Sequence, residues 1–455
     1  MPVEGHSTKL ADRIAKGLAR GITSVFFREI LVEGAEQIPS RGPLIYVMNH
    51  PNSMVDPVLV LGSLPRQPRF LARHGLWDIK AVRPFLKLAG SIPIYRMQDK
   101  GSWASRNQEA FTACHEALER GEVIAIFPEG MSHSQPAMLP LKTGVSRIFL
   151  GAEERCRGLG IRIIPIGLIF EARDRFRSRV LVKVGEPLDP AIGSFQHPRD
   201  SREARRSLNR RVDEALRGVT LNYRSWREAR LLERAVDIFL RSSSPLPERL
   251  DLGSQFGARR EFLEGLSEME RRDPGRTAAL ARAVEIYDRM LRFTGFRDEH
   301  VISSYSPGSV ARYVVRTLGR LLLFLPLAAV GTILNWLPYR VTARFAGRYA
   351  KLPEQPATKK LFGGFFVYPF FWGIEAGLVG WFWGKGAAFL TVLLAPAAGY
   401  CALLFHEDRQ SFLKESLIFL RLRTHRRIWQ SLRERRETLS RELACMVGEY
   451  RKTLN

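Results

Sequence analysis

A histidine and a carboxylate, His50 and Asp56, lie on one short turn near the start of the chain. The apolar run 44–48 before them predicts a buried strand, and Asp56-Pro57 predicts a helix start with Asp56 as the N-cap. A neutral imidazole can take a proton from a hydroxyl group, and a nearby carboxylate fixes the ring tautomer and stabilises the cation that forms. The pair is therefore suited to general base chemistry at the carboxyl end of a strand, where α/β sheets place their ligands.

The elements that must position this pair alternate between β-type runs and helical stretches, which is typical of βαβ units. Helix-like spacing is found at 103–120 and 142–156. We expect a mixed, largely parallel sheet with helices on its faces. The strands are expected at 29–32, 44–48, 69–72, 91–95, 123–127, 162–170 and 180–184.

Three further sequence blocks lie on or beside these predicted strands. They are Gly-Ser-Ile-Pro-Ile-Tyr-Arg at 90–96, Phe-Pro-Glu-Gly at 127–130 and Ile-Ile-Pro-Ile-Gly-Leu at 163–168. The chain has no Gly-x-Ser-x-Gly segment, so a serine nucleophile has no support in the sequence. One block alone would be weak evidence, because short motifs recur by chance.

Taken in order with Asn49-His50 and Asp56, these blocks resemble the glycerophospholipid acyltransferases, which include glycerol-3-phosphate and lysophosphatidate acyltransferases. The resemblance covers roughly residues 30–190, about a third of the chain. The family's common first block has four residues between His and Asp, whereas this chain has five, 51–55. The longer spacing is similar to a branch of the family that includes fungal glycerol-3-phosphate acyltransferases.

The resemblance implies a direct acyl transfer without an acyl-enzyme. His50 would act as general base on the acceptor hydroxyl, which attacks an acyl thioester, while Asp56 would orient the ring. The acyl donor would be acyl-CoA or acyl-carrier protein, and neither a cofactor nor a metal would be needed. The acceptor would be glycerol-3-phosphate or its 1-acyl derivative.

The resemblance also implies roles in acceptor binding. Arg96 would hold the acceptor phosphate, a task suited to a guanidinium group. Glu129 would position the glycerol hydroxyls, and Gly130 would let the backbone approach closely. Further candidates for substrate binding are Asn49, Phe127, Pro128, Arg73 and Lys142, of which the last two could add positive charge for the phosphate or the acyl carrier.

The net charge of +24 over 455 residues indicates an anionic partner, which could be nucleic acid, an anionic membrane or a phosphorylated substrate. Residues 199–297 are helical and rich in arginine, but acidic residues interrupt the arginines and few aromatic residues are interleaved. We therefore expect a solvated helical face and no nucleic acid. Breaks at 242–247 and 273–275 divide this region into three helices.

The cysteines and histidines predict no metal site or disulfide framework. The four cysteines are far apart, which favours a reducing compartment. His133 lies near the third block and could enter the site, whereas the remaining histidines, including His300, have no partner pattern. The first thirty residues are charged and show no secretion signal, so the amino-terminal domain is expected in the cytosol.

Two apolar stretches, 361–383 and 387–405, are long enough to cross a membrane as a hairpin. A third apolar stretch, 321–338, is borderline in length and is interrupted by Pro326 and Asn335. The segment 339–360 and the tail after 405 are basic, and positively charged flanks stay on the cytoplasmic side. We therefore expect 321–338 to be re-entrant or interfacial and the catalytic domain to lie on the cytoplasmic face.

Residues 7–27 predict a basic amphipathic helix. It could pack on the catalytic domain or lie in the interface of an anionic membrane. The expected organisation is 1–28 interfacial helix, 29–220 acyltransferase domain, 221–305 charged helical region, 306–405 membrane region and 406–455 basic helical tail.

The leading functional hypothesis is a membrane-bound acyltransferase of phospholipid synthesis. The alternative is a non-catalytic lipid-binding or membrane-shaping protein with a degenerate acyltransferase fold, in which the extra residue between His50 and Asp56 reflects lost chemistry.

Overall fold

The computed structural model describes residues 9–80, 82–95, 103–188, 202–241, 249–303, 305–349 and 355–454. The chain divides into two compact units. The first consists of Met1–Asn222 together with Ala346–Leu361, and the second consists of Tyr223–Phe345 together with Phe362–Asn455. A short piece of chain from the carboxy-terminal half therefore belongs to the amino-terminal unit.

The first unit contains a seven-stranded sheet in the order β1-β7-β6-β2-β5-β3-β4. Only the β6–β7 pair is antiparallel among the described strands; the other neighbouring pairs are parallel. This confirms the mixed, largely parallel sheet predicted from the sequence. The strands are β1 (Glu29–Glu33), β2 (Leu44–Met48), β3 (Pro68–Arg73), β4 (Ile92–Ile94), β5 (Val123–Ile126), β6 (Arg162–Phe170) and β7 (Arg179–Val184).

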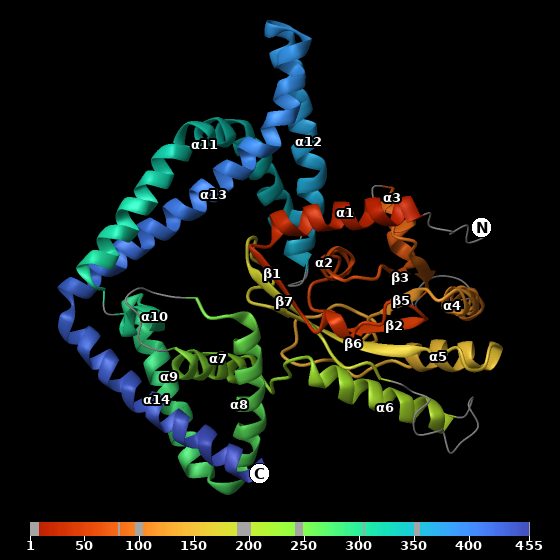
Figure 1. Cartoon of the computed structure of the whole chain (residues 1–455), viewed down its shortest axis with the longest axis horizontal. Helices are drawn as coiled ribbons and strands as arrows, with labels where there is room; N and C mark the ends of the chain where they lie inside the picture. Colours follow the sequence, from red (N-terminus) through yellow and green to blue (C-terminus); the bar gives the residue numbers. More distant parts are fainter. Residues whose placement is uncertain are drawn as a thin grey trace. The chain divides into compact units, whose positions relative to one another are not determined.

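Helices cover both faces of this sheet (Figure 1). Alternate residues of β2 point to opposite faces. Ile45 and Val47 pack in one core with apolar residues of α4, α5 and α6, while α1 and α2 lie over the other face. The helices of this unit are α1 (Lys9–Phe26), α2 (Val55–Ser63), α3 (Arg83–Leu88), α4 (Trp103–Glu119), α5 (Gly144–Arg155) and α6 (Arg202–Gly218), with 3-10 turns at Ala35–Gln37 and His74–Leu76.

The described residues between 202 and 294 form four helices, so the prediction of three was wrong. They are α6, α7 (Trp226–Leu240), α8 (Leu252–Arg272) and α9 (Pro274–Thr294). The missed break precedes Ser225, whose hydroxyl caps α7 by accepting a hydrogen bond from Glu228 N at 3.1 Å. Ser-x-x-Glu is a readable helix-start signal. The break expected at 242–247 lies outside the described residues.

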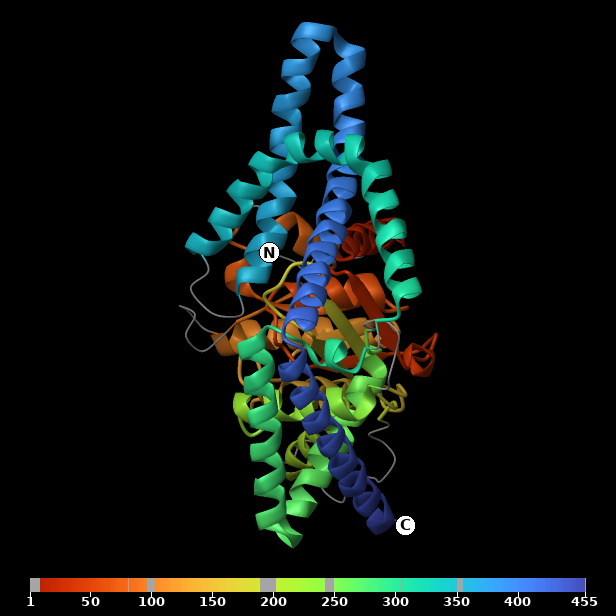
Figure 2. The same cartoon turned by 90° about the vertical axis from the view of Figure 1, so that its left-hand side faces the viewer.

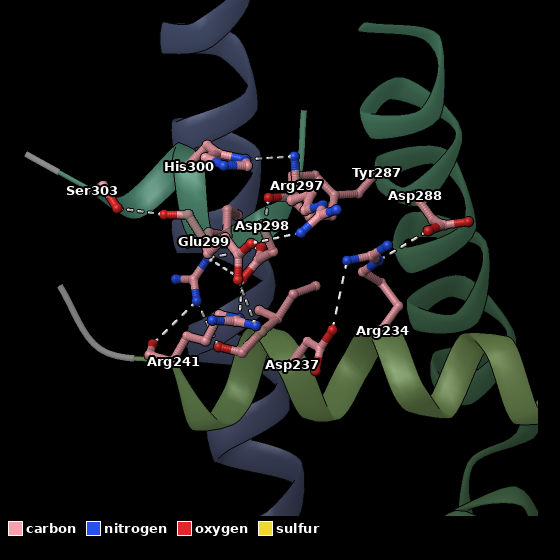
Figure 3. Close-up of polar contacts among 12 residues, drawn as sticks. Arg234, Asp237, Arg241, Tyr287, Asp288, Arg297, Asp298, Glu299, His300 and Ser303 are labelled. Carbon is pink, nitrogen blue, oxygen red and sulfur yellow. Dashed lines mark hydrogen bonds and ion pairs between the residues drawn. The ribbon is translucent and has the colours of Figure 1, made fainter. Parts of the chain in front are cut away.

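The predicted carboxy-terminal tail forms part of a helical bundle. Helix α14 (Arg426–Leu454) packs against α7, α8 and α9, and it buries Leu432, Leu439 and Leu443. A buried polar network crosses this bundle (Figure 3). Asp298 of α10 (Asp298–Ile302) accepts hydrogen bonds from Tyr287 at 2.7 Å and from Arg436 at 3.0 Å.

His300 also joins this network, although its sequence surroundings showed no partner. The ring is fully buried, and Nε2 lies 3.0 Å from a carboxylate oxygen of Glu415 in α13. Glu299, beside it on α10 (Figure 3), pairs with Arg241 at 3.2 Å. Polar side chains that are buried in this way are satisfied by partners distant in sequence, which local patterns do not reveal.

The second unit also contains the greater part of three helices that are long and apolar enough to cross a membrane. They are α11 (Pro307–Tyr349), α12 (Gln355–Trp383) and α13 (Lys385–Thr424). In each helix, at most 17% of the most apolar segment is buried. Gly384, with φ +85°, joins α12 and α13 into the predicted hairpin (Figure 2).

Pro326 and Asn335 interrupt the apolar stretch of α11 but do not break the helix. It instead bends into an arch whose two ends lie on the same side of its middle (Figures 1 and 2). Proline is a common cause of such bends. Asn335 is buried, donates to the carbonyl of Ala395 in α13 at 3.4 Å and accepts from Trp372 of α12 at 3.0 Å. The side-chain amide thereby links all three apolar helices.

Candidate active site

The structure brings His50 and Asp56 together in spite of the five residues between them. His50 Nδ1 lies 2.8 Å from Asp56 Oδ2, and Asn52 N donates to the same oxygen at 2.8 Å. The Asp56 side chain is fully buried, whereas that of His50 is 19% exposed. Because Nδ1 donates to the carboxylate, Nε2 keeps its lone pair, and no partner of Nε2 is found among the described residues. The ring is thus arranged to accept a proton at Nε2.

Burial raises the pKa of Asp56, and the hydrogen bonds from His50 and Asn52 partly oppose this effect. The Arg173 guanidinium lowers the same pKa through its positive charge. The Oδ1 atom has no hydrogen-bond partner in the described part of the chain. The carboxylate is therefore held in a low-dielectric site where its charge acts strongly on the imidazole.

The extra residue of the turn is absorbed at Ser53, whose φ of +49° lies in the left-handed region. This conformation closes a turn in which Val55 N donates to Asn52 O at 3.1 Å, and the helix then starts one residue earlier than predicted. Helix α2 begins at Val55, so the prediction of Asp56 as N-cap was wrong. Met54 N is satisfied from a distant segment, since it donates to Thr358 Oγ1 at 3.2 Å.

The Phe127–Gly130 block lies directly beside His50. The Phe127 ring stacks on the imidazole, with centroids 4.0 Å apart and planes inclined by 16°. Gly130 has φ +74°, and a Cβ there would lie 2.7 Å from Lys142 Nζ. Lys142 N donates to the carbonyl of Pro128 at 2.8 Å. The block therefore provides one wall for the imidazole, and its Gly130 lies against the end of the Lys142 side chain.

Two predicted substrate-binding residues make contacts within the protein. The Asn49 amide donates to the carbonyl of Leu168 at 3.1 Å and accepts from Leu168 N at 2.8 Å, which ties the end of β2 to β6. The Glu129 side chain is fully buried, and its oxygens accept hydrogen bonds from the backbone of His50 and of Leu139.

The arginines at this sheet edge include one that was predicted and one that was not. Arg73 is exposed at the end of β3, which runs parallel to β4 and β5 and so ends at the same sheet edge as β2. Arg96 lies outside the described residues. The sequence did not single out Arg173, which follows β6 at this edge; its carbonyl accepts from Asn52 Nδ2 at 2.9 Å. Its position just after the fourth block was the available signal.

The segment that carries this site is similar in sequence to known acyltransferases. Residues 29–169 match the protein-family model described as Acyltransferase. Over 199 residues the chain is 31% identical to glycerol-3-phosphate O-acyltransferase 2 of Saccharomyces cerevisiae, covering 43% of this chain and 26% of that protein. Over 446 residues it is 24% identical to glycerol-3-phosphate O-acyltransferase 1 of the same yeast, covering 78% and 57%. The chain thus spans about a quarter and just over half of these two relatives.

A plant relative and a solved structure complete the comparison. The 1-acyl-sn-glycerol-3-phosphate acyltransferase BAT2 of Brassica napus is 26% identical over 139 residues, which cover 30% of this chain and 36% of that protein. The crystal structure of the 1-acyl-sn-glycerophosphate acyltransferase PlsC of Thermotoga maritima matches with a TM-score of 0.35 and 24% identity, covering 46% and 78%.

The fold and the matched segment define an acyltransferase domain at the amino-terminal end of the chain. The three relatives that share this domain are named as glycerol-3-phosphate or 1-acyl-glycerol-3-phosphate acyltransferases.

Proposed function

We propose that the chain is a membrane-bound O-acyltransferase of phospholipid synthesis. It transfers a fatty acyl group from acyl-CoA or acyl-carrier protein to glycerol-3-phosphate or its 1-acyl derivative. The observation that carries this proposal is the contact of 2.8 Å between His50 Nδ1 and the buried Asp56, inside the segment that matches the acyltransferase family. The contact also speaks against the non-catalytic alternative, which rested on the extra residue between the two.

In the proposed reaction, His50 Nε2 accepts the proton of the acceptor hydroxyl while that oxygen attacks the thioester carbonyl. A carbon–oxygen bond forms, the carbon–sulfur bond breaks, and the imidazolium returns its proton to the leaving thiolate. Asp56 stabilises the imidazolium through Nδ1. The donor is a substrate, so the reaction needs no cofactor.

Cationic side chains at the sheet edge would bind the acceptor phosphate. Arg73 is the last residue of β3, Arg173 follows β6, and the Lys142 ammonium group lies against Gly130. Arg96 remains the candidate suggested by the family motif. The names of the two yeast relatives favour glycerol-3-phosphate as the acceptor to test first.

The membrane-facing parts of the proposal rest on two observations. Helix α1 buries Ala15 and Ala19, yet leaves Leu10 and Ile14 65% and 52% exposed. An apolar stripe that faces outward beside basic residues suits the interface of an anionic bilayer. The second observation is that Ala346–Leu361 belongs to the catalytic unit.

The second observation supports a re-entrant α11. The segment after α11 packs with the catalytic domain through Thr358 and through Lys360, whose Nζ donates to Asp174 O at 2.9 Å. The segments on either side of the α11 arch would then both lie on the catalytic side, which we propose is cytoplasmic. A reporter fused within 339–349 should report the cytoplasmic side; an extracytoplasmic signal would overturn this topology.

The activity is tested with purified full-length protein, labelled acyl-CoA or acyl-carrier protein, and a panel of acceptors. We expect transfer to glycerol-3-phosphate or its 1-acyl derivative and no transfer by His50→Ala. Equal activity of His50→Ala and the wild type would overturn the mechanism. Absence of transfer to every phosphorylated acceptor would overturn the proposed substrate class.

A further inference from the structure

The loop that carries His50 is fixed by a carboxylate from another strand end. Glu129 Oε1 accepts a hydrogen bond from His50 N at 3.0 Å, and Oε2 accepts from Leu139 N at 2.7 Å. The His133 ring also contacts Oε2 through Nε2. The carboxylate therefore joins the catalytic turn to the segment that follows the Phe127–Gly130 block.

His133 completes this arrangement from the other side. Its backbone N donates to the carbonyl of His50 at 3.2 Å, so both the N–H and the C=O of His50 are held. His133 Nδ1 accepts from Gln135 N at 3.1 Å, which leaves Nε2 as the protonated nitrogen that donates to Glu129. The two side chains thus form one connected network around the peptide groups of His50.

This network leaves little room for a role of Glu129 in binding the acceptor. Three donors converge on its two oxygens, and the side chain has no exposed surface. Because the side chain is fully enclosed, a substrate hydroxyl could reach it only by displacing the groups packed around it, and a buried N–H that lost its partner in this way would be costly.

We propose that Glu129 and His133 are positioning residues, which hold the backbone of His50 and do not touch the acceptor. The proposal rests on the proposed function, because it assigns these residues to the same transfer reaction. It departs from the role that the family resemblance implies for Glu129. The geometry of the base determines the rate once substrate is bound, whereas acceptor binding determines KM.

Glu129→Gln tests the carboxylate. In either orientation of the amide, its nitrogen meets a donor, either His50 N–H on one side or Leu139 N–H and the His133 ring on the other. We expect kcat to fall about 100-fold, as for a displacement of a catalytic group by about 1 Å. The KM for the acceptor should stay within about twofold, because no acceptor contact is removed.

His133 provides a second pair of variants in case Glu129→Gln does not fold. His133→Ala removes the donor to Glu129 and should lower kcat about tenfold, which corresponds to one lost hydrogen bond to a charged group. His133→Gln carries an amide N–H that can occupy the place of Nε2, so it should restore most of that loss. If His133 only filled space, kcat would not depend on whether its replacement carries an N–H donor.

The matched control is Glu153→Gln. Glu153 lies on α5, is 8% exposed and accepts from Gly158 N at 3.2 Å, so it is another buried carboxylate on backbone N–H in the same unit. This variant should keep the wild-type kcat and KM. Thermal unfolding of each variant shows whether a loss of activity follows a loss of folded protein.

The outcomes separate this inference from the proposed function. Glu129→Gln with unchanged kcat and an acceptor KM raised about tenfold or more would show substrate binding and overturn the inference. Equal activities of His133→Ala and His133→Gln would also overturn it. Full activity of His50→Ala in the same assay would instead overturn the general-base mechanism of the proposed function, whatever the Glu129 and His133 variants do.

Discussion

Replacement of Asp56 by asparagine would separate the charge of this side chain from its shape. Asn52 N donates to Oδ2, so the new amide oxygen should take that place and also accept from His50 Nδ1. The amide nitrogen would then occupy the place of Oδ1, which has no partner in the described part of the chain. His50 keeps its tautomer in this arrangement, and only the negative charge is lost.

The expected cost follows from the charge that develops on His50 during the reaction. Opposite charges about 4 Å apart attract by about 4 kcal/mol at an effective dielectric of about 20. Loss of that attraction in the transition state corresponds to about a 1000-fold lower kcat. The KM for the acceptor should change little, because the imidazole is neutral in the ground state.

The same substitution should not weaken the fold. Burial raises the pKa of Asp56, so the folded state binds this proton more tightly than the unfolded state. The stability that the group contributes is then present below the unfolded pKa and is lost as the pH rises through the folded pKa. An ionised Asp56 therefore costs folding free energy, and Asp56→Asn should melt at or above the wild-type temperature near neutral pH.

Steady-state acyl transfer and thermal unfolding of the full-length protein test both expectations. Retention of kcat within about threefold of the wild type would refute the charge argument. A melting temperature several degrees below that of the wild type would refute the argument from burial. Asp56→Ala, which also frees the His50 ring, should be at least as inactive.

Three other changes test the structure elsewhere. Ser53→Val should destabilise the protein by about 1–2 kcal/mol, since a β-branched residue must adopt the left-handed conformation, whereas Ser53→Gly should be tolerated in thermal unfolding and activity. Asp298→Ala leaves Arg436 buried without its ion pair and should cost about 3–5 kcal/mol, measured as a lower melting temperature of the solubilised protein. A photoreactive residue at Ile14 should crosslink to bilayer lipid, while one at exposed Glu154 on α5 should not; equal crosslinking at both would exclude an interfacial role of α1.

The sheet could be predicted because apolar runs and turn residues are local signals. All seven strands were expected, and their bounds differ from the structure by a residue or two; β2 and β6 match at both ends. Once the sheet is predicted, the place of the site can be predicted too, because parallel strands bring His50, Phe127 and Arg73 to one edge of the sheet.

The contacts within the site could not be predicted in the same way. The turn closes on Asp56 because Ser53 adopts a positive φ, which no residue type demands at that position. Glu129 and His50 are 79 residues apart, so their hydrogen bond depends on how β2 and β5 pair. The continuity of α11 through Pro326 also depends on contacts distant in sequence, since neighbouring helices can satisfy the backbone groups that proline leaves without a hydrogen bond.

The catalytic unit is discontinuous in sequence, because Ala346–Leu361 completes it. A polypeptide truncated after residue 222 would lose Thr358, the partner of Met54 in the catalytic turn. Removing the apolar helices to obtain a soluble enzyme would thus also remove part of the support of His50. A soluble version should retain residues 346–361, rejoined to the amino-terminal piece through a flexible linker.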